Sequence, residues 1–250
     1  MKIALITGGS RGLGRSMALH LAREGHGSIV TYHRREQDAK EVVNAIRDIG
    51  GEAFALQLDV TKSDTFPAFA DAVRNALEQT WDRARFDFLV NNAGMGVFKP
   101  LMQTTEEEFD LLVNAHLRTP LFLTQQLLPL IEDGGKILNV SSGLARFTLP
   151  GHAAYAAMKG AVEVLTRYMA KELGDRRISA NVLAPGAIET DFGNGAVRDN
   201  KDLNAFVAAN TALGRAGQPD DIGRATAALL SDEFGWINGQ RIEASGGMLL

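Results

Sequence analysis

Two side chains that can transfer protons stand four residues apart in the second half of the chain. Tyr155 and Lys159 follow Pro150 and Gly151, and the sequence predicts a helix from about His152 to residue 173. Residues four apart share one face of a helix, with Cβ atoms about 5–6 Å apart. We therefore expect the phenol and the ammonium to point the same way. The positive charge favours the phenolate, so we expect the pKa of Tyr155 to fall below its usual value of about 10.

A phenol of this kind suits the interconversion of a ketone and an alcohol, because it can give or take the proton at the substrate oxygen. Ser142 is predicted at the end of the preceding strand, where its hydroxyl would hold the same oxygen. The Tyr–Lys pair alone is also compatible with an ordinary surface helix, on which such pairs occur by chance. The chemical interpretation therefore depends on what the rest of the chain places beside it.

Composition excludes several kinds of site. The 250 residues include no cysteine, which excludes disulfides, Cys-ligated metals and a Cys nucleophile. The 5 histidines show no metal-ligand spacing, so no metal site is predicted. The net charge of −4 argues against nucleic acid as a partner. No stretch approaches the ~20 apolar residues of a membrane span. The apolar run at residues 1–7 is too short for a secretory signal, so a cytoplasmic location is expected.

Short apolar runs alternate with longer amphipathic segments along the whole chain. Strands are predicted at residues 2–7, 28–32, 53–58, 86–90, 136–140, 178–183 and 240–243. Helices are predicted from the glycine-rich loop to Glu24 and at 36–49, 64–80, 106–131 with a kink near Pro120, 152–173, 202–211 and 220–230. This pattern predicts one α/β domain over residues 1–250, a doubly wound, seven-stranded parallel sheet with helices on both faces. The long irregular segment 187–217 is predicted to form a substrate lid.

In such a sheet, ligands bind outside the carboxyl ends of the strands. The unusual residues of this chain fall at those ends: residues 8–14, Asp59, residues 91–94, Ser142 and residues 185–190. This coincidence predicts a single active site there.

A glycine-rich loop joins the first strand to the first helix. Gly8, Gly12 and Gly14 have the spacing G-x-x-x-G-x-G. Glycines at such a turn let the backbone approach a pyrophosphate, which then lies at the helix N-terminus. Simple turn chemistry is the alternative, but the strand before the loop and the helix after it favour a nucleotide site.

The end of the second strand indicates which nucleotide is bound. His33 and Arg34 stand there, and no acidic residue occurs between Ser28 and Arg35. An acidic residue at this place binds the ribose 2′-hydroxyl of NAD, whereas an arginine suits the 2′-phosphate of NADP. With Arg11 from the glycine loop, Arg34 is predicted to bind that phosphate, so NADP is favoured over NAD. A solvated basic loop is the alternative.

Three further polar positions allow two interpretations each. Residues 91–94 read NNAG, which permits close approach of a cofactor or pins neighbouring strands. Asn114, inside an apolar helical run, either satisfies a buried backbone group or organises a water near Lys159. Asp59 either meets the adenine or caps the turn that follows it.

Taken together, these segments resemble the short-chain dehydrogenase/reductase family over nearly the whole chain. Its T-G-x-x-x-G-x-G motif matches residues 7–14, its N-N-A-G motif residues 91–94, and its P-G-x-I-x-T segment residues 185–190. Its catalytic Asn, Ser, Tyr and Lys match, in order, Asn114, Ser142, Tyr155 and Lys159.

The resemblance implies a Rossmann-type domain and a role for each residue. Tyr155 would be the general acid/base, Ser142 would bind the carbonyl oxygen, Lys159 would bind the nicotinamide ribose and lower the Tyr pKa, and Asn114 would hold a water in a proton relay. Contacts to NADP(H) would come from Gly8, Ser10, Arg11, Gly12, Leu13, Gly14, His33, Arg34, Asp59, Val60, Asn91, Ala93, Gly94, Tyr155, Lys159, Pro185, Gly186, Ile188 and Thr190. A homotetramer is also implied, built through the long helices near residues 110–131 and 154–172 and the C-terminal segment.

Within the family the chain resembles 3-oxoacyl-[acyl-carrier-protein] reductases and related ketone reductases. Glu132 and Asp133 depart from the basic patch that carrier-protein reductases carry, although Arg176 and Arg177 would supply half of one. The acidic pair weakens the carrier-protein interpretation, because a carrier protein is itself acidic.

The implied reaction is NADPH-dependent reduction of a ketone, 3-oxoacyl or other, to a secondary alcohol. Apolar residues of the lid and of the loop after Ser142 predict a substrate with an apolar portion: Phe192, Phe206, Val207, Leu213, Leu144, Phe147, Leu149 and His152. Two alternatives remain, an NAD-dependent alcohol dehydrogenase working in the oxidative direction and an NADP-binding regulator without catalysis.

Overall fold

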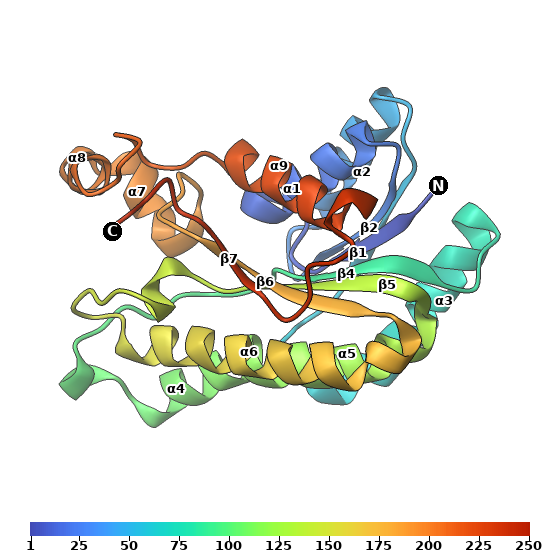
Figure 1. The fold of residues 1–250 in the computed structure, drawn as a ribbon, viewed down its shortest axis with the longest axis horizontal. Helices are drawn as coiled ribbons and strands as arrows, with labels where there is room; N and C mark the ends of the chain where they lie inside the picture. Colours follow the sequence, from blue (N-terminus) through green and yellow to red (C-terminus); the bar gives the residue numbers. More distant parts are fainter.

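A seven-stranded parallel sheet forms the centre of the molecule (Figure 1). The computed structural model describes residues 1–250 and gives the strand order β3-β2-β1-β4-β5-β6-β7. The strands are β1 (Ile3–Ile6), β2 (Gly27–Tyr32), β3 (Ala53–Gln57), β4 (Phe86–Asn91), β5 (Ile131–Val140), β6 (Ser179–Pro185) and β7 (Arg241–Ala244). Every pairing is parallel, so all strands end at the same side of the molecule. The chain winds outward from β1 in both directions, which confirms the predicted doubly wound sheet.

Helices cover both faces of this sheet. One face carries α1 (Gly12–Arg23), α2 (Glu36–Asp48) and α9 (Pro219–Leu230), and the other carries α3 (Phe66–Trp81), α5 (Thr119–Leu127) and α6 (Ala153–Glu172). Ile3 and Leu5 of β1 point into one hydrophobic cluster, while Ala4 and Ile6 point into the other. Because successive side chains of a strand point to opposite faces, a strand buried on both sides is apolar throughout. This is why the strands could be recognised as continuous apolar runs.

The predicted long helix at 106–131 is broken at a different place from the one expected. It consists of α4 (Glu106–Val113), a π-helical turn (Asn114–Arg118), α5 and a 3₁₀ turn (Leu128–Leu130). Pro120 lies in the first turn of α5, where a missing N–H costs no helical hydrogen bond. The interruption is therefore the π-turn before the proline, a wider turn with i→i+5 hydrogen bonds.

The strand predicted at 136–140 begins earlier, at Ile131. Gly134 and Gly135 lie within β5, which starts at Ile131 and shifts register against β4 between Phe86 and Phe88. Gly134 takes a φ of +80°, a conformation that glycine adopts readily. The glycines therefore make an irregular start to the strand and do not end a helix.

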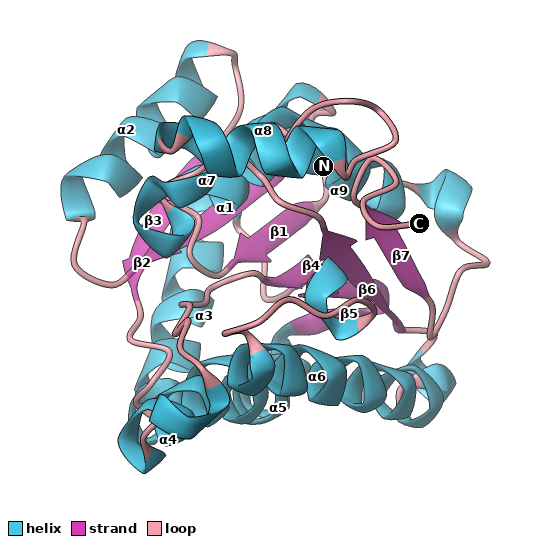
Figure 2. Cartoon of the chain, turned by 90° about the vertical axis from the view of Figure 1, so that its left-hand side faces the viewer, coloured by secondary structure: helices cyan, strands magenta, loops and turns pink.

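The segment between β6 and α9 lies over the carboxyl ends of the strands, the end of the sheet seen in Figure 2. It holds a 3₁₀ turn (Phe192–Gly195), α7 (Ala196–Asp199) and α8 (Lys201–Ala209), and α8 corresponds to the helix predicted at 202–211. We call residues 187–217 the lid segment. None of the helices combines the length and the apolar character that a membrane-spanning helix needs.

Candidate active site

Tyr155 and Lys159 lie on the buried face of α6, as their spacing predicts. Tyr155 is 7 % exposed, Lys159 is 5 % exposed, and the Lys159 Nζ lies 5.4 Å from the centre of the Tyr155 ring. The helix begins at Ala153, just after Pro150 and Gly151, whose φ of +82° turns the chain into it. Local turn chemistry thus brings both side chains to the carboxyl end of β5.

A hydrogen bond to the sheet fixes the Lys159 ammonium. Its Nζ donates to the Val140 carbonyl, the last residue of β5, at 2.8 Å. Burial lowers the pKa of Lys159 to about 7. This lysine therefore changes its charge near neutral pH.

The predicted fall in the pKa of Tyr155 is wrong for the protein chain itself. Burial raises the pKa of the phenol well above its usual value, and the hydroxyl of Ser142, which acts to lower the pKa by hydrogen bonding, offsets only part of the effect. The Lys159 charge faces the ring, but its ammonium is hydrogen-bonded to a backbone carbonyl. Desolvation is the larger effect, so Tyr155 is a neutral phenol and a proton donor.

The two serines after β5 have different tasks. Ser141 Oγ donates to Glu163 Oε1 at 2.7 Å and approaches the Lys159 carbonyl at 3.2 Å, which ties the strand end to α6. Ser142 Oγ accepts a hydrogen bond from the Leu144 amide at 3.2 Å. Its hydroxyl also acts to lower the pKa of the Tyr155 phenol by hydrogen bonding. Of the two serines, only Ser142 therefore presents its hydroxyl to the phenol, and its predicted contact with the substrate oxygen stays a prediction.

A histidine that the sequence analysis did not select completes this group. His116 is 2 % exposed, and its ring meets that of Tyr155 edge to face, with centroids 5.2 Å apart and planes at 89°. Burial, with a smaller effect of the Lys159 charge, lowers the pKa of His116 to about 3. The signal in the sequence was a histidine inside the same apolar run that drew attention to Asn114.

Asn114 itself contributes only backbone atoms to the hydrogen bonds of the structure. Its carbonyl accepts from Thr119 Oγ1 at 2.8 Å and from the Thr119 amide, which closes the π-turn. The side chain that the structure brings against Tyr155 from this turn is that of His116. The relay role of Asn114 stays a prediction.

Thr7 and Asn92 hold the glycine-rich loop in place. Thr7 Oγ1 accepts hydrogen bonds from the Asn92 and Ala93 amides at 3.0 Å, and Asn92 Nδ2 donates to the Thr7 and Gly8 carbonyls at 2.9 and 3.2 Å. Gly8 takes a φ of +65°. Asn92 was not among the predicted site residues, because a tetrapeptide gives no indication of which of two asparagines turns toward the loop.

The side chain of Asn91 does not face the nucleotide loop. It is buried beside α5, and its Nδ2 donates to Asn139 Oδ1 of β5 at 2.8 Å and to Thr124 Oγ1 of α5 at 3.2 Å. The alternative that Asn91 pins neighbouring strands is therefore confirmed, and its contact with the cofactor stays a prediction.

The arginines near the glycine-rich loop are not equally available to bind a phosphate. Arg11 forms an ion pair with Asp191 of the lid segment at 3.2 Å, and Arg35 pairs with Asp38 at 3.3 Å. Arg34 is exposed and has no carboxylate partner. Among these arginines, Arg34 is the one whose guanidinium is open to a phosphate.

Asp59 serves the turn after β3. Its Oδ1 accepts from the Thr61 amide at 3.0 Å and from Thr61 Oγ1 at 2.7 Å, and its Oδ2 lies 3.4 Å from His33 Nε2. Burial works to raise the pKa of Asp59, but the two Thr61 hydrogen bonds outweigh it and keep the pKa low. The capping alternative is thereby confirmed, and the adenine contact stays a prediction.

The start of the lid segment lies against the glycine loop. A Cβ on Gly12 would lie 3.7 Å from Thr190, whose Oγ1 accepts from the Phe192 amide at 3.1 Å. Ile188 pairs with Gly217, which closes the base of the lid segment. The other predicted cofactor residues lie on the loops after the strands or at the adjoining ends of α1 and β6: Ser10, Leu13, Val60, Gly94, Pro185 and Gly186.

Aromatic rings gather around Tyr155 on the side of the lid segment. The Phe98 ring centre lies 5.8 Å from that of Tyr155, 6.0 Å from that of Phe192 and 4.7 Å from that of His152. The Phe192 ring centre lies 5.9 Å from that of Tyr155. Phe98 and Phe192 are still 39 % and 42 % exposed, so rings next to the phenol are open to a ligand.

Glu132 and Asp133, the acidic pair after α5, form ion pairs and lie at the opposite end of β5 from Ser142. Glu132 pairs with Arg83 at 3.1 Å, and Asp133 pairs with Arg176 at 2.8 Å. Both acids lie at the amino end of β5, whereas Ser142 follows its carboxyl end. The charge argument drawn from this pair against an acidic carrier protein is therefore wrong for the substrate side of the molecule.

The chain is similar to known proteins over its whole length. A family model described as enoyl-(acyl carrier protein) reductase matches residues 8–249. The hydroxynaphthalene reductase-like protein Arp2 of Metarhizium brunneum is 37 % identical, covering 98 % of this chain and 94 % of the relative.

Solved structures agree. The promiscuous reductase LugOII, which catalyses keto-reduction at C1 during lugdunomycin biosynthesis, has a TM-score of 0.94 at 36 % identity, covering 100 % of this chain and 98 % of its own. The angucycline C-6 ketoreductase LanV with bound NADP has a TM-score of 0.94 at 33 % identity, covering 99 % and 95 %. With a serine, a tyrosine and a lysine gathered at the carboxyl end of this sheet, the chain belongs to the short-chain dehydrogenase/reductase family of oxidoreductases.

Proposed function

We propose that this protein reduces a ketone to a secondary alcohol with NADPH, and that Tyr155 donates the proton. The observation that carries the proposal is the buried position of the phenol, with Ser142 and Lys159 beside it at the carboxyl end of β5. Burial keeps Tyr155 protonated, the Ser142 hydroxyl acts on it, and Lys159 lies behind its ring. A neutral phenol suits the reductive direction, in which the acid must hold its proton until the carbonyl oxygen gains charge.

The backbone around the glycine loop fits a dinucleotide. Gly8 and Gly12 take φ values of +65° and +53°, and a Cβ on Gly14 would lie 2.3 Å from the Gly8 carbonyl, so the loop can only be built with glycine. The loop opens α1, whose first amides are a site for a pyrophosphate. Arg34 would hold the 2′-phosphate. NADP bound to LanV supports this choice of cofactor.

When bound, NADPH supplies the hydride that reaches the carbonyl carbon. Ser142 holds the carbonyl oxygen by a hydrogen bond, and Tyr155 gives that oxygen its proton as the C–O π bond becomes an alkoxide lone pair. The phenolate left behind is stabilised by the Lys159 ammonium and takes its proton back from solvent. One ketone, one NADPH and one proton thus give one alcohol and one NADP⁺.

The rings beside Tyr155 favour a flat aromatic ketone as substrate. Phe98, Phe192 and His152 would bind such a molecule by stacked or edge-to-face contacts, which contribute about 0.5–1.5 kcal/mol each beyond burial. LanV and the hydroxynaphthalene reductase-like relative have names that refer to fused-ring molecules, which supports this class over a flexible 3-oxoacyl chain.

The test is the oxidation of NADPH, followed by absorbance, with a panel of aromatic and aliphatic ketones. Tyr155→Phe should bind NADPH as the wild type does and lose turnover by about 10²–10⁴-fold. Unchanged turnover would refute the assignment. Tight NADPH binding with no turnover of any ketone would favour the regulator, and efficient alcohol oxidation with NAD would favour the oxidative dehydrogenase.

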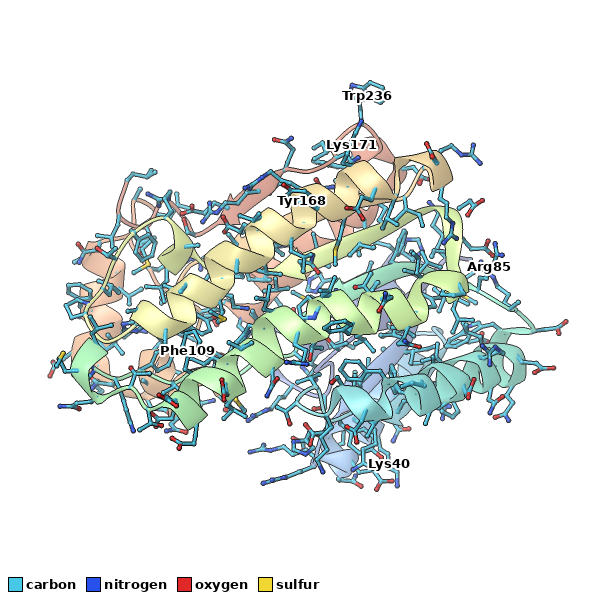
Figure 3. All side chains as sticks on the ribbon, turned by 90° about the horizontal axis from the view of Figure 1, so that it is seen from below. Lys40, Arg85, Phe109, Tyr168, Lys171 and Trp236 are labelled. Atoms are coloured by element: carbon cyan, nitrogen blue, oxygen red, sulfur yellow. The ribbon has the colours of Figure 1, made fainter.

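We also propose that the protein forms a homotetramer through the face of α4, α5 and α6, shown in Figure 3. Exposed apolar side chains lie on these helices: Phe109, Leu121, Phe122, Val164 and Tyr168. Several exposed apolar side chains on neighbouring helices favour an interaction site on this side of the molecule. Tyr168→Glu should lower the mass measured by light scattering, and an unchanged tetramer would place the interface elsewhere.

A further inference from the structure

His116 is held by one ring nitrogen and leaves the other without a partner. Its Nε2 lies 2.6 Å from the Met95 carbonyl and 3.4 Å from the Met95 amide nitrogen, and the much shorter contact to the carbonyl decides the tautomer. A carbonyl only accepts hydrogen bonds, so Nε2 carries the proton and Nδ1 has a free lone pair. That Nδ1 is buried and makes no hydrogen bond in the structure. A buried acceptor without a donor is costly, and in a native protein it calls for a functional explanation.

His116 lies among the residues that are proposed to carry out the reaction. The titratable groups that face His116 are Tyr155 and Lys159, both on α6, and the loop after β4 contributes only backbone. A Cβ on Gly94 would lie 2.5 Å from Cε1 and 3.2 Å from Nδ1, so the ring lies directly under the NNAG loop. The imidazole ring thus lies against the Tyr155 ring and under the predicted cofactor loop, close enough to Lys159 for the ammonium charge to act on it.

The π-turn gives the imidazole this position. His116 is the third residue of Asn114–Arg118, where the helix widens between α4 and α5. Isolated π-turns inside α-helices are frequent at functional sites. Three separate observations thus concern the His116 side chain: its place in the π-turn, the contact of Nε2 with the Met95 carbonyl, and the buried Nδ1 without a hydrogen-bond partner.

We propose that His116 is a positioning residue of the active site, whose Nδ1 accepts a hydrogen bond on the path that returns a proton to Tyr155. The inference rests on the proposed function. After Tyr155 has given its proton to the substrate oxygen, a proton from solvent must reach the phenolate through the Lys159 ammonium or a water bound to it. The His116 lone pair orients that donor and, with Nε2–H held by Met95, does not itself gain or lose a proton.

Three variants of His116 separate the roles of its two ring nitrogens. His116→Asn keeps an acceptor at the place of Nδ1, His116→Gln keeps a donor at the place of Nε2, and His116→Phe keeps only the ring shape. We expect kcat to fall about ten- to a hundredfold in the Phe and Gln variants, less than the 10²–10⁴ of a full acid–base group, and to recover partly in the Asn variant. His26→Phe is the matched control, because His26 also packs edge to face on an aromatic ring, that of Phe88, but lies at the amino end of β2.

The readouts distinguish positioning from mere packing. The Phe and Gln variants should bind NADPH normally, shift the pH profile of kcat and increase its solvent deuterium isotope effect, because the return of the proton becomes slower. Equal losses in all three His116 variants that follow a fall in Tm, with an unmoved pH profile, would overturn the proposal. So would an Asn114→Ala variant that moves the profile while His116→Phe does not.

A measurement without turnover completes the test. In the wild-type protein with NADP⁺ bound, the ¹⁵N shifts of His116 should show a neutral ring protonated on Nε2 throughout pH 5–8. An imidazole that titrates in this range, or that carries its proton on Nδ1, would overturn the inference. A failure of the Tyr155→Phe test would instead refute the proposed function and leave the tautomer result standing.

Discussion

Arg11 of the glycine-rich loop and Asp191 of the lid segment form an ion pair, with Nη1 and Oδ2 3.2 Å apart. The same carboxylate also pairs with Arg198 of α7 at 2.5 Å. The lid segment is therefore attached to the nucleotide loop through a group that was predicted to bind the 2′-phosphate. Arg11 has two competing anionic partners, the lid carboxylate and the cofactor.

Asp191→Asn should tighten NADPH binding, because Arg11 then has no ion pair with residue 191 to break before it binds the cofactor. Exposed pairs contribute about 0.2–1 kcal/mol, so the gain in affinity should be at most about fivefold and should shrink at high salt. Fluorescence titration with NADPH and with NADH measures it. An equal change for both nucleotides would show that Arg11 does not contact the 2′-phosphate.

Arg34→Ala should reduce the affinity for NADPH about tenfold or more and leave NADH binding nearly unchanged, because a charge-assisted hydrogen bond contributes about 1.5–3 kcal/mol. Arg35→Ala is the matched control, since Arg35 is next in the chain but already pairs with Asp38. If the two variants lose the same small amount, the basic pair is only a solvated loop and the preference for NADP has another origin.

Gly14→Ala should abolish cofactor binding or folding. The added Cβ would lie 2.3 Å from the Gly8 carbonyl and 2.7 Å from Asn92 Nδ2, and the first of these is backbone that cannot move aside. Gly160→Ala on α6 is the control, because its Cβ would meet nothing within 4 Å and alanine favours a helix over glycine by about 0.8–1.0 kcal/mol. Thermal unfolding should show a fall in Tm for the first and a small rise for the second. A Gly14→Ala protein that folds and binds NADPH would contradict the loop geometry.

His116 should also make the protein sensitive to acid. Burial lowers the pKa of His116 from 6.5 to about 3, so between these values the unfolded chain binds a proton that the folded protein does not. Stability is then complete above pH 6.5 and falls as the pH drops, at about 1.4 kcal/mol per unit. The wild type should lose about 2–3 kcal/mol from this group at pH 4.5.

Urea unfolding at pH 7 and pH 4.5 measures this loss. His116→Phe should show a smaller difference between the two pH values than the wild type does. His26→Phe should change it less, because His26 is less buried, although burial lowers its pKa too. An identical pH dependence in wild type and His116→Phe would mean that the imidazole is protonated in the folded protein.

The sequence was sufficient for the fold because the apolar patterns are local. Strands such as β1 are apolar on both faces, and turn glycines mark their ends, so a doubly wound parallel sheet with helices on both faces follows from the alternation. The same holds for Tyr155, Lys159 and Ser142, whose meeting depends only on helix spacing and on the rule that active sites lie at the carboxyl ends of the strands.

What the sequence could not indicate depends on contacts between distant segments. The pKa of Tyr155 was predicted from one neighbouring charge, but the effect of burial is larger, and burial is a property of the packed molecule. Asn91 and Asn92 are adjacent and identical, yet the first faces α5 and the second holds the glycine loop. A π-turn has no sequence signature of its own, so the position of His116 was not foreseen.

The widened turn at Asn114–Arg118 also determines which kind of genetic change would separate the imidazole from the phenol. A π-turn holds one more residue than a turn of α-helix, so loss of one residue here would restore regular winding and leave the flanking helices α4 and α5 almost unrotated. The hydrophobic contacts of both flanks would be kept. A single codon deletion within the turn would thus produce a well-folded chain in which only the residues of the turn, His116 among them, change position.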